Sequence, residues 1–349
     1  MAKIQKHIEI VRSNTRGLSS MSIKSATAIA EVLAKHYESV RLTNIDAIDD
    51  LKMLVLRKPD LVFLGMKYVP SSLDGKKIWI SGYLKDHDIT HTGSAERAVK
   101  YEQNKPFAKQ CLIEAGLSTS PYFVFKAGDI LEEENIKLTF PLFVKPTCLG
   151  AGQGVDEHSI VYNFNELRTK VDSIINTFKV DALVEEYLPG REFSVAVLKQ
   201  RESEDFMAMP IEMHPGADVN GDRILSNALK AGEIETPVSQ LSEGVLKQKL
   251  TELAYGVFKT LGARDYGRID IKLSTVGAPN FLEANLIPSI INNSGNFQKA
   301  CLINNGISYE DMLLHIVGLA FDRVETVKTL DDTDGLAAIL VPGTIVEAR

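Results

Sequence analysis

The sequence has few cysteines, no long apolar run and no excess of positive charge. Only three cysteines occur in 349 residues, and their spacing fits neither a disulfide framework nor a metal-ligand motif. No apolar run approaches membrane-spanning length, and the first residues lack the apolar core of a targeting segment. The formal net charge of -7 gives no electrostatic gain on a nucleic-acid backbone. We therefore expect a cytoplasmic protein that binds neither nucleic acid nor membrane.

Composition and length indicate a globular protein with more than one lobe. Hydrophobic residues make up 44% of the chain and charged residues 24%, as is typical of globular proteins. A chain of 349 residues is long enough for two or three lobes with sizeable cores. The acidic net charge says little about small anionic substrates, because these need only a local basic pocket.

The first hundred residues alternate apolar strands with a helix. The expected elements are strands at 8–12, 40–45 and 61–66 and a helix at 20–37. Ser20 is the expected N-cap of that helix. Strands that alternate with helices form parallel sheets, whose ligands bind at the carboxyl ends of the strands. The loops 12–19 and 67–72 are therefore candidate ligand loops, although plain connections would look the same.

A second lobe is expected after a helix over about 96–115, which Gly116 ends at its C-cap. Strands in PYFVFKAG and PLFVKP frame this lobe, with an acidic helix around EEENIK between them. The glycine-rich segment 149–155 follows, and backbone N–H groups in such segments can bind phosphate. It lacks the Lys-Ser or Lys-Thr ending of a P-loop, and a simple hairpin turn is the alternative.

The segment 181–198 places two acids at the ends of apolar strands that flank a Leu-Pro-Gly turn. Carboxylates such as Glu185 and Glu192 can accept hydrogen bonds from ribose hydroxyls or from an adenine amino group. The alternative is a hairpin with a charged rim.

The segment 267–294 contains two alternating strands separated by a Gly-Ala-Pro turn, which predicts an antiparallel pair. This pair would bring Asp270 close to Glu283 and Asn285, with Leu282 and Ala284 on the opposite face of the strand. Two carboxylates and an amide oxygen suit Mg²⁺ that retains waters and contacts substrate phosphates. Polar residues that only face solvent are the alternative interpretation.

The order of these segments resembles that of the ATP-grasp superfamily and, within it, the D-alanine-D-alanine ligase group. The resemblance covers about 8–320 and is carried by NKPFAKQCLIEAGL, FPLFVKP, EEYLPGREFSVAVL, GRIDIKL and FLEANLIP. It implies an α/β and α+β protein, in which an N-terminal parallel-sheet domain precedes two α+β lobes that clamp ATP. The implied divisions are 1–96, 97–205, 206–325 and a C-terminal extension at 326–349.

The resemblance also implies roles for individual residues. Those implied for ATP are Lys105 and Lys145 at the phosphates, Gly150, Ala151 and Gly152 in the glycine-rich loop, Glu185, Glu186 and Leu188 at adenine, and Glu192 at ribose. Those implied for two Mg²⁺ ions, or Mn²⁺ in their place, are Asp270, Glu283 and Asn285. Those implied for catalysis and for the acceptor are Arg268 at the tetrahedral intermediate, Lys230 in a closing loop over 214–236, the backbone amide of Ser289 at the oxyanion, and Ser294 at the acceptor carboxylate. A homodimer is also expected from the resemblance.

The implied chemistry is amide formation through an acyl phosphate. Transfer of the γ-phosphoryl group of ATP to a carboxylate creates a good leaving group, which an amine then displaces. Both steps concentrate negative charge, which metal ions and fixed cations stabilise in a site that excludes water.

The sequence departs from the group where the first substrate binds. A glutamate, a serine and a tyrosine that together hold the substrate ammonium and the closing loop become Leu18, Ala151 and Ala231. A histidine becomes Lys67, and a glycine becomes Ser289. We therefore expect an ATP-dependent carboxylate-amine ligase with an amino-acid acceptor and a donor other than D-alanine, contacted by Leu18 and Lys67. The alternatives are an authentic D-alanine-D-alanine ligase of cell-wall synthesis and a nucleotide-binding protein without catalysis.

Overall fold

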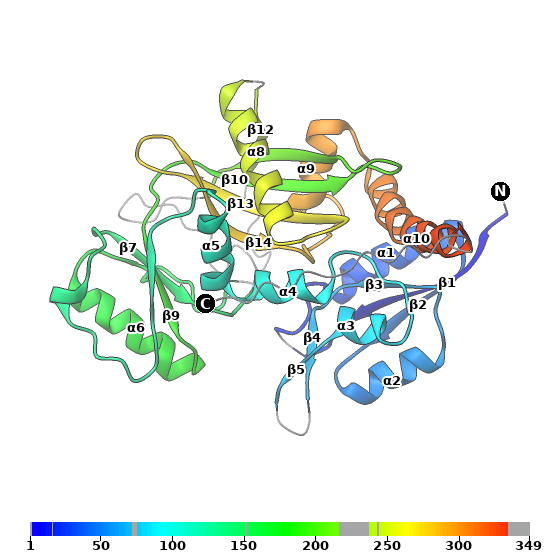
Figure 1. Ribbon diagram of the computed structural model, residues 1–349, viewed down its shortest axis with the longest axis horizontal. Helices are drawn as coiled ribbons and strands as arrows, with labels where there is room; N and C mark the ends of the chain where they lie inside the picture. The colour runs from blue at the N-terminus through cyan, green and yellow to red at the C-terminus, as the bar shows by residue number, and fades with distance from the viewer. Residues whose placement is uncertain are drawn as a thin grey trace, which may run out of the picture.

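The computed structural model describes residues 2–15, 17–71, 75–150, 152–215, 237–242 and 244–333, with side chains as far as 323. Figure 1 shows an N-terminal α/β region, a smaller lobe that contains α6, and a larger lobe built on a second antiparallel sheet. Within those residues, no helix has both the length and the apolar character that crossing a membrane requires.

A parallel sheet of strand order β2-β1-β3 forms the N-terminal region, which confirms the sequence prediction. Its elements are β1 (Ile4–Arg12), α1 (Ile23–His36), β2 (Tyr37–Asn44), α2 (Ile48–Leu56) and β3 (Leu61–Leu64). The predicted cap at Ser20 was wrong. Ser22 caps α1 instead, because its backbone is extended and its hydroxyl accepts a hydrogen bond from the Ser25 N–H at 3.1 Å.

The helix expected over 96–115 is two helices, so that prediction was wrong. The elements after β3 are β4 (Tyr68–Pro70), β5 (Lys77–Trp79), α3 (Ile80–Lys85), α4 (Glu96–Gln103) and α5 (Lys105–Glu114). Asn104 separates α4 from α5, because its backbone leaves the helical region and its side chain accepts a hydrogen bond from the Phe107 N–H. Pro106 lies in the first turn of α5, where a missing N–H removes no helical bond. Gly116 follows α5 as predicted, with a φ of +75°.

The smaller lobe is an antiparallel sheet of order β6-β9-β7-β8 that packs against α6. Its elements are β6 (Tyr122–Phe125), η1 (Glu133–Asn135), β7 (Leu142–Pro146), β8 (Ile160–Val161), α6 (Phe164–Phe178) and β9 (Ala182–Glu186). The predicted acidic helix was wrong, because the segment contains only the 3-10 turn η1. Its apolar residues Leu131, Ile136 and Leu138 pack on the core of the lobe but lack the spacing of a helix face.

The larger lobe is an antiparallel sheet of order β12-β11-β10-β13-β14 with helices packed on it. Its elements are β10 (Glu192–Lys199), β11 (Phe206–Met213), β12 (Val238–Gln240), α8 (Val245–Thr260), β13 (Tyr266–Leu273), β14 (Pro279–Asn285), α9 (Asn296–Asn305) and α10 (Tyr309–Thr333). The strands β9 and β10 belong to different sheets, so the segment between them is a crossing rather than a hairpin. Gly190 fits this crossing because a Cβ there would lie 2.5 Å from the carbonyl oxygen of Leu273.

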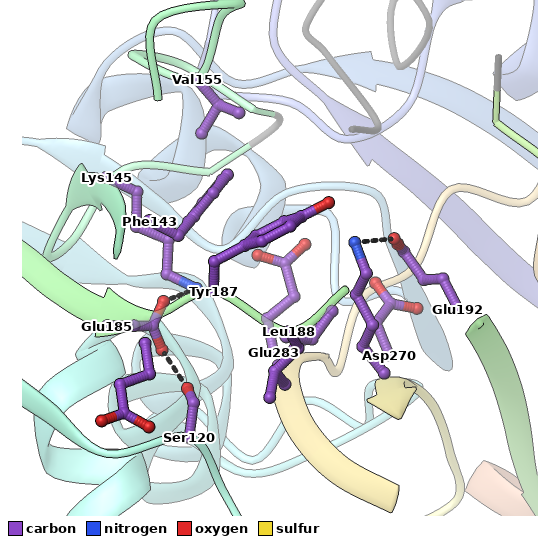
Figure 2. Close-up of a pocket in the computed structure, with 13 residues that line it drawn as sticks. Ser120, Phe143, Lys145, Val155, Glu185, Tyr187, Leu188, Glu192, Asp270 and Glu283 are labelled. Atoms are coloured by element: carbon purple, nitrogen blue, oxygen red, sulfur yellow. Dashed lines mark hydrogen bonds and ion pairs between the residues drawn. The ribbon is translucent and has the colours of Figure 1, made fainter. Parts of the chain in front are cut away.

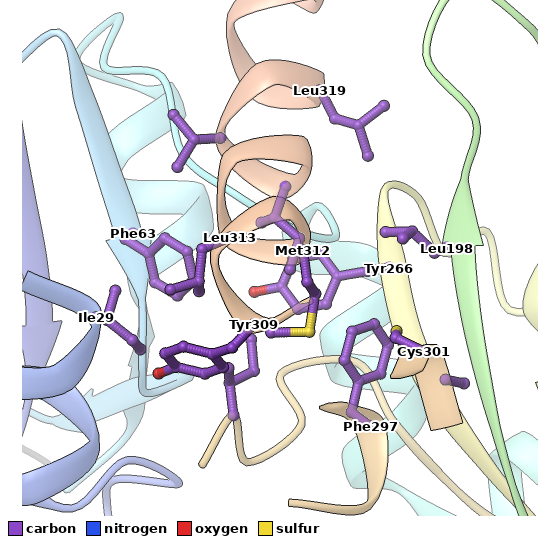
Figure 3. Packing of buried hydrophobic residues seen from close by; sticks show 14 of the residues in the cluster. Ile29, Phe63, Leu198, Tyr266, Phe297, Cys301, Tyr309, Met312, Leu313 and Leu319 are labelled. Atoms are coloured by element: carbon purple, nitrogen blue, oxygen red, sulfur yellow. The ribbon is translucent and has the colours of Figure 1, made fainter. Parts of the chain in front are cut away.

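One apolar core joins the N-terminal region to the larger lobe. In Figure 3, Ile29 and Phe63 from the N-terminal region approach Tyr309 and Leu313 of α10, with Tyr266 of the larger lobe beyond them. The smaller lobe has a separate core that shares no residue with this one. The smaller lobe is therefore packed as a body of its own, and the domain limits inferred from the sequence stay a prediction.

Candidate active site

A cleft that is partly open to solvent is lined by residues of the smaller and larger lobes (Figure 2). Among the residues implied by the sequence, seven line it: Lys145, Glu185, Glu186, Leu188, Glu192, Asp270 and Glu283. The other lining residues are Ser120, Phe143, Val155, Tyr187, Lys272 and Leu282. Segments far apart in the sequence thus converge on one cleft.

A buried carboxylate shared by two lysines forms one wall of the cleft. Lys145 Nζ lies 2.6 Å from one oxygen of Glu185, and Lys109 Nζ lies 2.5 Å from the other. The Lys109 ammonium also donates to the hydroxyls of Thr119 and Ser120, at 2.5 and 3.0 Å. Both oxygens of Glu185 are therefore occupied, and Figure 2 shows this carboxylate between Lys145 and Ser120.

The charges of this cluster are set by competition between burial and pairing. Burial alone would raise the pKa of Glu185, but Lys109 and Lys145 outweigh it and lower that pKa to about 2. Burial lowers the pKa of Lys109, and the charge of Glu185 opposes that shift. Glu185 is therefore an anion at neutral pH, and it holds the Lys145 ammonium at the cleft.

Lys109 was missed by sequence reasoning, although a signal for it exists. It lies on α5 next to Ala108 and three residues before Leu112, and all three side chains are buried. A lysine on the buried stripe of a helix needs a partner, because an unpaired buried ammonium is costly. That pattern predicts a buried acid, but it does not say which one.

The crossing from β9 to β10 presents main-chain groups to the cleft. The N–H of Glu186 donates to the carbonyl of Pro121 at 3.0 Å, and that of Tyr187 donates to Pro141 at 3.1 Å. These bonds fix the segment, whereas the N–H of Leu188 makes no hydrogen bond to any residue that the structure describes. Beyond it, Glu192 lies 3.7 Å from the Lys272 ammonium, which stands over the Tyr187 ring. The segment therefore brings a main-chain donor and an acid, four residues apart in the sequence, to the same cleft.

The strands β13 and β14 bring the implied metal ligands together. Asp270 is directly opposite Glu283, and Arg268 is directly opposite Asn285, which confirms the predicted antiparallel pair. The register shifts after Asp270, so that Leu282 is an extra residue in β14. Leu282 consequently lines the cleft together with Glu283, and the prediction that it faces the opposite way was wrong.

Asp270 is held by three neighbours. Arg268 donates to both carboxylate oxygens at 2.9 Å, Ser194 donates at 2.9 Å, and the amide nitrogen of Asn285 donates at 3.3 Å. Burial lowers the pKa of Arg268, but Asp270, and more weakly Glu283 and Glu102, outweigh it and raise that pKa. Arg268 is therefore a permanent cation beside the two carboxylates of the cleft.

The donor chemistry fits Mg²⁺, with ligands from outside the chain completing its shell. No group of three or more histidine, cysteine, aspartate or glutamate side chains suits a metal ion in the described part of the chain. Asp270 and Glu283 supply carboxylate oxygens, and the Asn285 amide, which uses its nitrogen toward Asp270, has its oxygen left. Magnesium commonly takes one or two carboxylates and fills its other positions with waters and substrate phosphates.

The glycine-rich segment lies beside the N-terminal region. Gly152 and Gly154 have φ values of +73° and +75°, and Lys105 Nζ donates to the carbonyl of Leu149. A Cβ on Gly17 would lie 2.9 Å from the side-chain nitrogen of Gln153, so this segment closely approaches the first N-terminal loop. Lys105 does not line the cleft, and Gly150 lies at the exposed start of the loop. Ala151 lies outside the described residues.

Leu18 and Lys67, the residues expected to contact the donor, are neighbours, and neither lines the cleft. Ser19 forms a β-bridge with Met66, which places the residues on either side of that bridge close together. Leu18 packs partly buried against the N-terminal core, whereas Lys67 forms a close ion pair with Glu102 of α4. Lys67 is thus paired with an acid of the protein. That acid, Glu102, is the second residue after Lys109 that sequence reasoning missed.

The remaining implied residues lie on the segment after β14 or outside the described residues. Ser289 is partly buried, and Ser294 is exposed just before α9. Gly295, which follows Ser294, lies close to Ser289, because a Cβ on Gly295 would lie 3.1 Å from the carbonyl oxygen of Ser289. Lys230, Ala231 and all but the first two residues of the closing loop expected over 214–236 lie outside the described residues.

Comparisons with known proteins agree with this geometry. Residues 111–318 match the family model described as D-ala D-ala ligase C-terminus. The D-alanine-D-alanine ligase of Aquifex aeolicus is 30% identical over 275 residues, covering 77% of this chain and 86% of that protein. The corresponding ligase of Geotalea uraniireducens is 27% identical over 319 residues, covering 90% of this chain and 96% of that protein.

Solved structures share the fold over nearly the whole chain. The D-alanine-D-alanine ligase of Bacillus anthracis complexed with ATP superposes with a TM-score of 0.71 at 20% identity, covering 93% of this chain and 99% of that one. The D-alanine-D-alanine ligase of Coxiella burnetii superposes with a TM-score of 0.68 at 17% identity, covering 94% of this chain and 97% of that one. Together with the mixed parallel and antiparallel sheets, these matches confirm the ATP-grasp fold.

Proposed function

Because the chain belongs to the D-alanine-D-alanine ligase family of ATP-dependent ligases, we propose that it joins two amino acids in a peptide bond. D-alanine is the first candidate for both substrates, since the relatives bear that name. The observation that carries the proposal is the antiparallel pair that sets Asp270 and Glu283 at the same cleft as Lys145 and Glu185, with Arg268 bonded to Asp270 beside them. Members of this family use ATP and Mg²⁺.

In the first step a carboxylate oxygen of the donor attacks the γ-phosphorus of ATP, and ADP leaves. We assign the Lys145 ammonium, fixed by Glu185, and Lys105 to the phosphates, with Glu186, Leu188 and Glu192 at the nucleoside. Asp270, Glu283 and Asn285 would hold Mg²⁺, which would supply positive charge to the transferring phosphoryl group. The same cleft holds the Lys145 ammonium, fixed by Glu185, and the carboxylates of Asp270 and Glu283, which are the two kinds of group that this step uses.

In the second step the acceptor amine attacks the carbonyl carbon of the acyl phosphate, and inorganic phosphate leaves with one oxygen of the donor. Negative charge develops on the carbonyl oxygen, and we assign its stabilisation to Arg268 and to the backbone N–H of Ser289. Arg268 suits this role because its bidentate contact with Asp270 fixes its plane. Ser294, before α9, is assigned to the acceptor carboxylate.

A donor other than D-alanine is the second candidate. It rests on Leu18 in place of the acid that the D-alanine-D-alanine ligase group carries in this loop. The accompanying argument, that Lys67 offers a free cation to a second donor carboxylate, has lost its support because Lys67 pairs with Glu102. The names of the relatives favour D-alanine at least as well, so D-alanine is the first substrate to test.

The test incubates the purified protein with Mg-ATP and either D-alanine alone or pools of amino acids and small carboxylic acids. We expect ADP and phosphate in equal amounts with a product whose mass is that of two substrates less one water. D-alanyl-D-alanine from D-alanine alone supports the first candidate. Turnover only with another acid supports the second, and ATP binding without any conjugate in any pool contradicts the ligase proposal.

A further inference from the structure

Glu102 is a buried acid with only one of its two oxygens in use. It lies near the end of α4 and is 8% exposed, and its Oε1 contacts the Lys67 ammonium. Its Oε2 is buried and accepts no hydrogen bond in the part of the chain that the structure describes. Buried carboxylate oxygens are rarely left unsatisfied, because desolvation without a partner is costly. This oxygen therefore needs a donor that the described residues do not provide.

The surroundings of Glu102 indicate what that donor is. Its charge lies close enough to Arg268 to interact with it, and Lys67 places it beside the loop that carries Leu18. In an α-amino acid, the nitrogen and the carboxylate carbon are bonded to the same carbon atom. A carboxylate that binds the donor ammonium must therefore lie near Arg268, which is assigned to the carbonyl group at the reacting carbon. Glu102 meets this requirement, because its charge interacts with that of Arg268.

We propose that Glu102 Oε2 binds the ammonium of the amino-acid donor, while Lys67 holds Oε1 and so orients the carboxylate. This inference rests on the proposed function and names the residue that selects an amine-bearing donor. It also accounts for Leu18, because an acid supplied from α4 makes a second acid in the first loop unnecessary. An acid without an α-amine, such as propionate, leaves Oε2 buried without a partner and is rejected.

The test separates donor binding from acceptor binding by using hydroxylamine as the acceptor. Hydroxylamine traps an acyl phosphate as a hydroxamate, so the rate against donor concentration gives the KM for the donor. We expect Glu102→Gln to raise the KM for D-alanine, or for the best amino acid, by about tenfold or more, with the KM for ATP within about twofold. The preference for the amino acid over propionate, as a ratio of kcat/KM, falls by about the same factor. Glu96→Gln is the matched control, because Glu96 is on the same helix but pairs with Lys100 at the surface.

A second pair of variants tests replacement of one acid by another. Leu18→Glu added to Glu102→Gln should return the donor KM to within about threefold of the unchanged protein. If circular dichroism shows that Glu102→Gln does not fold, Glu102→Asp replaces it, and we expect an intermediate donor KM because the carboxylate is withdrawn by one methylene.

The outcomes distinguish this inference from the proposed function. An unchanged donor KM and an unchanged preference over propionate in a folded Glu102 variant contradict the role of Glu102 alone. Hydroxamate from no amino acid, even with the unchanged protein, contradicts the proposed function itself.

Discussion

Two buried glutamates, Glu185 assigned to the nucleotide end of the proposed reaction and Glu102 assigned to the donor end, have their carboxylate oxygens satisfied to different degrees. Glu185, at the nucleotide end, has a lysine on each oxygen and a further hydrogen bond from Ser120. Glu102, at the donor end, has Lys67 on one oxygen and no partner among the described residues on the other. The fully satisfied acid fixes protein groups around a ligand, whereas the half-satisfied acid is suited to contact the ligand itself. Replacing Glu185 or its lysines should therefore change stability and ATP affinity, whereas replacing Glu102 should change the KM for the donor.

The largest effect is expected at Arg268, which is bonded to Asp270. Replacing Arg268 by methionine removes the fixed cation assigned to the developing oxyanion, and we expect kcat to fall by about 10²–10³-fold. The KM for ATP should change little, because the contacts assigned to ATP lie elsewhere in the cleft. Arg191→Met is the control, since Arg191 pairs with Glu212 in a half-exposed position. A fall in kcat of less than about tenfold would remove Arg268 from the mechanism.

At the nucleotide end, loss of one lysine should cost stability as well as ATP affinity. Lys109→Met leaves Glu185 with a single cation in a buried site, and we expect the free energy of unfolding to fall by about 3–5 kcal/mol. Lys170→Met is the comparison, because Lys170 is buried but its partner Asp156 is about half exposed. We expect about 1 kcal/mol there. Urea denaturation measures the unfolding free energy of both variants. Equal losses would show that the buried Glu185 cluster contributes no more than the half-exposed Lys170–Asp156 pair.

The same cluster should make stability depend on pH in the acid range. The pKa of Glu185 is lowered from the ordinary 4.5 to about 2, so its ionisation favours the folded state. Its contribution is complete above about pH 4.5 and is lost as the pH falls toward 2. We expect the stability of the unchanged protein relative to Glu185→Gln to decline over that window. A difference that stays constant from pH 6 to about pH 3 would exclude a strongly lowered pKa.

The smallest effect is expected at the donor end. Leu18→Glu in the otherwise unchanged protein should alter the donor KM by no more than about threefold, because Glu102 already supplies the ammonium site. The same change in the Glu102→Gln background should matter far more. A large decrease in the donor KM from Leu18→Glu alone would show that Glu102 does not already supply the ammonium site.

Residues close in sequence or related by strand period could be placed from the sequence. Alternation and a tight turn were enough to set Asp270 opposite Glu283, because a two-residue period and a hairpin leave little freedom. The shifted register at Leu282 was not foreseen, since a bulge inserts one residue without a sequence signature of its own. The break at Asn104 could have been read from the following Lys105-Pro106, which starts a new helix.

Partners far apart in the chain could not be found in this way. Glu185 and Lys109 are separated by 76 residues, and Glu102 and Lys67 by 35, so neither pairing follows from local periodicity. Each pair depends on how separate elements pack. The sequence therefore selected acids that line the cleft, but neither the lysine Lys109 that pairs with Glu185 nor the buried acid Glu102.

The most direct test of the account follows one oxygen atom. D-alanine, or the amino acid that the enzyme accepts, is labelled with ¹⁸O in its carboxylate and converted with Mg-ATP. An acyl phosphate transfers one donor oxygen to phosphate, so we predict one ¹⁸O in each inorganic phosphate released with the dipeptide. Phosphate that contains no ¹⁸O, formed alongside dipeptide, would contradict the mechanism on which the roles of Arg268 and Lys145 depend.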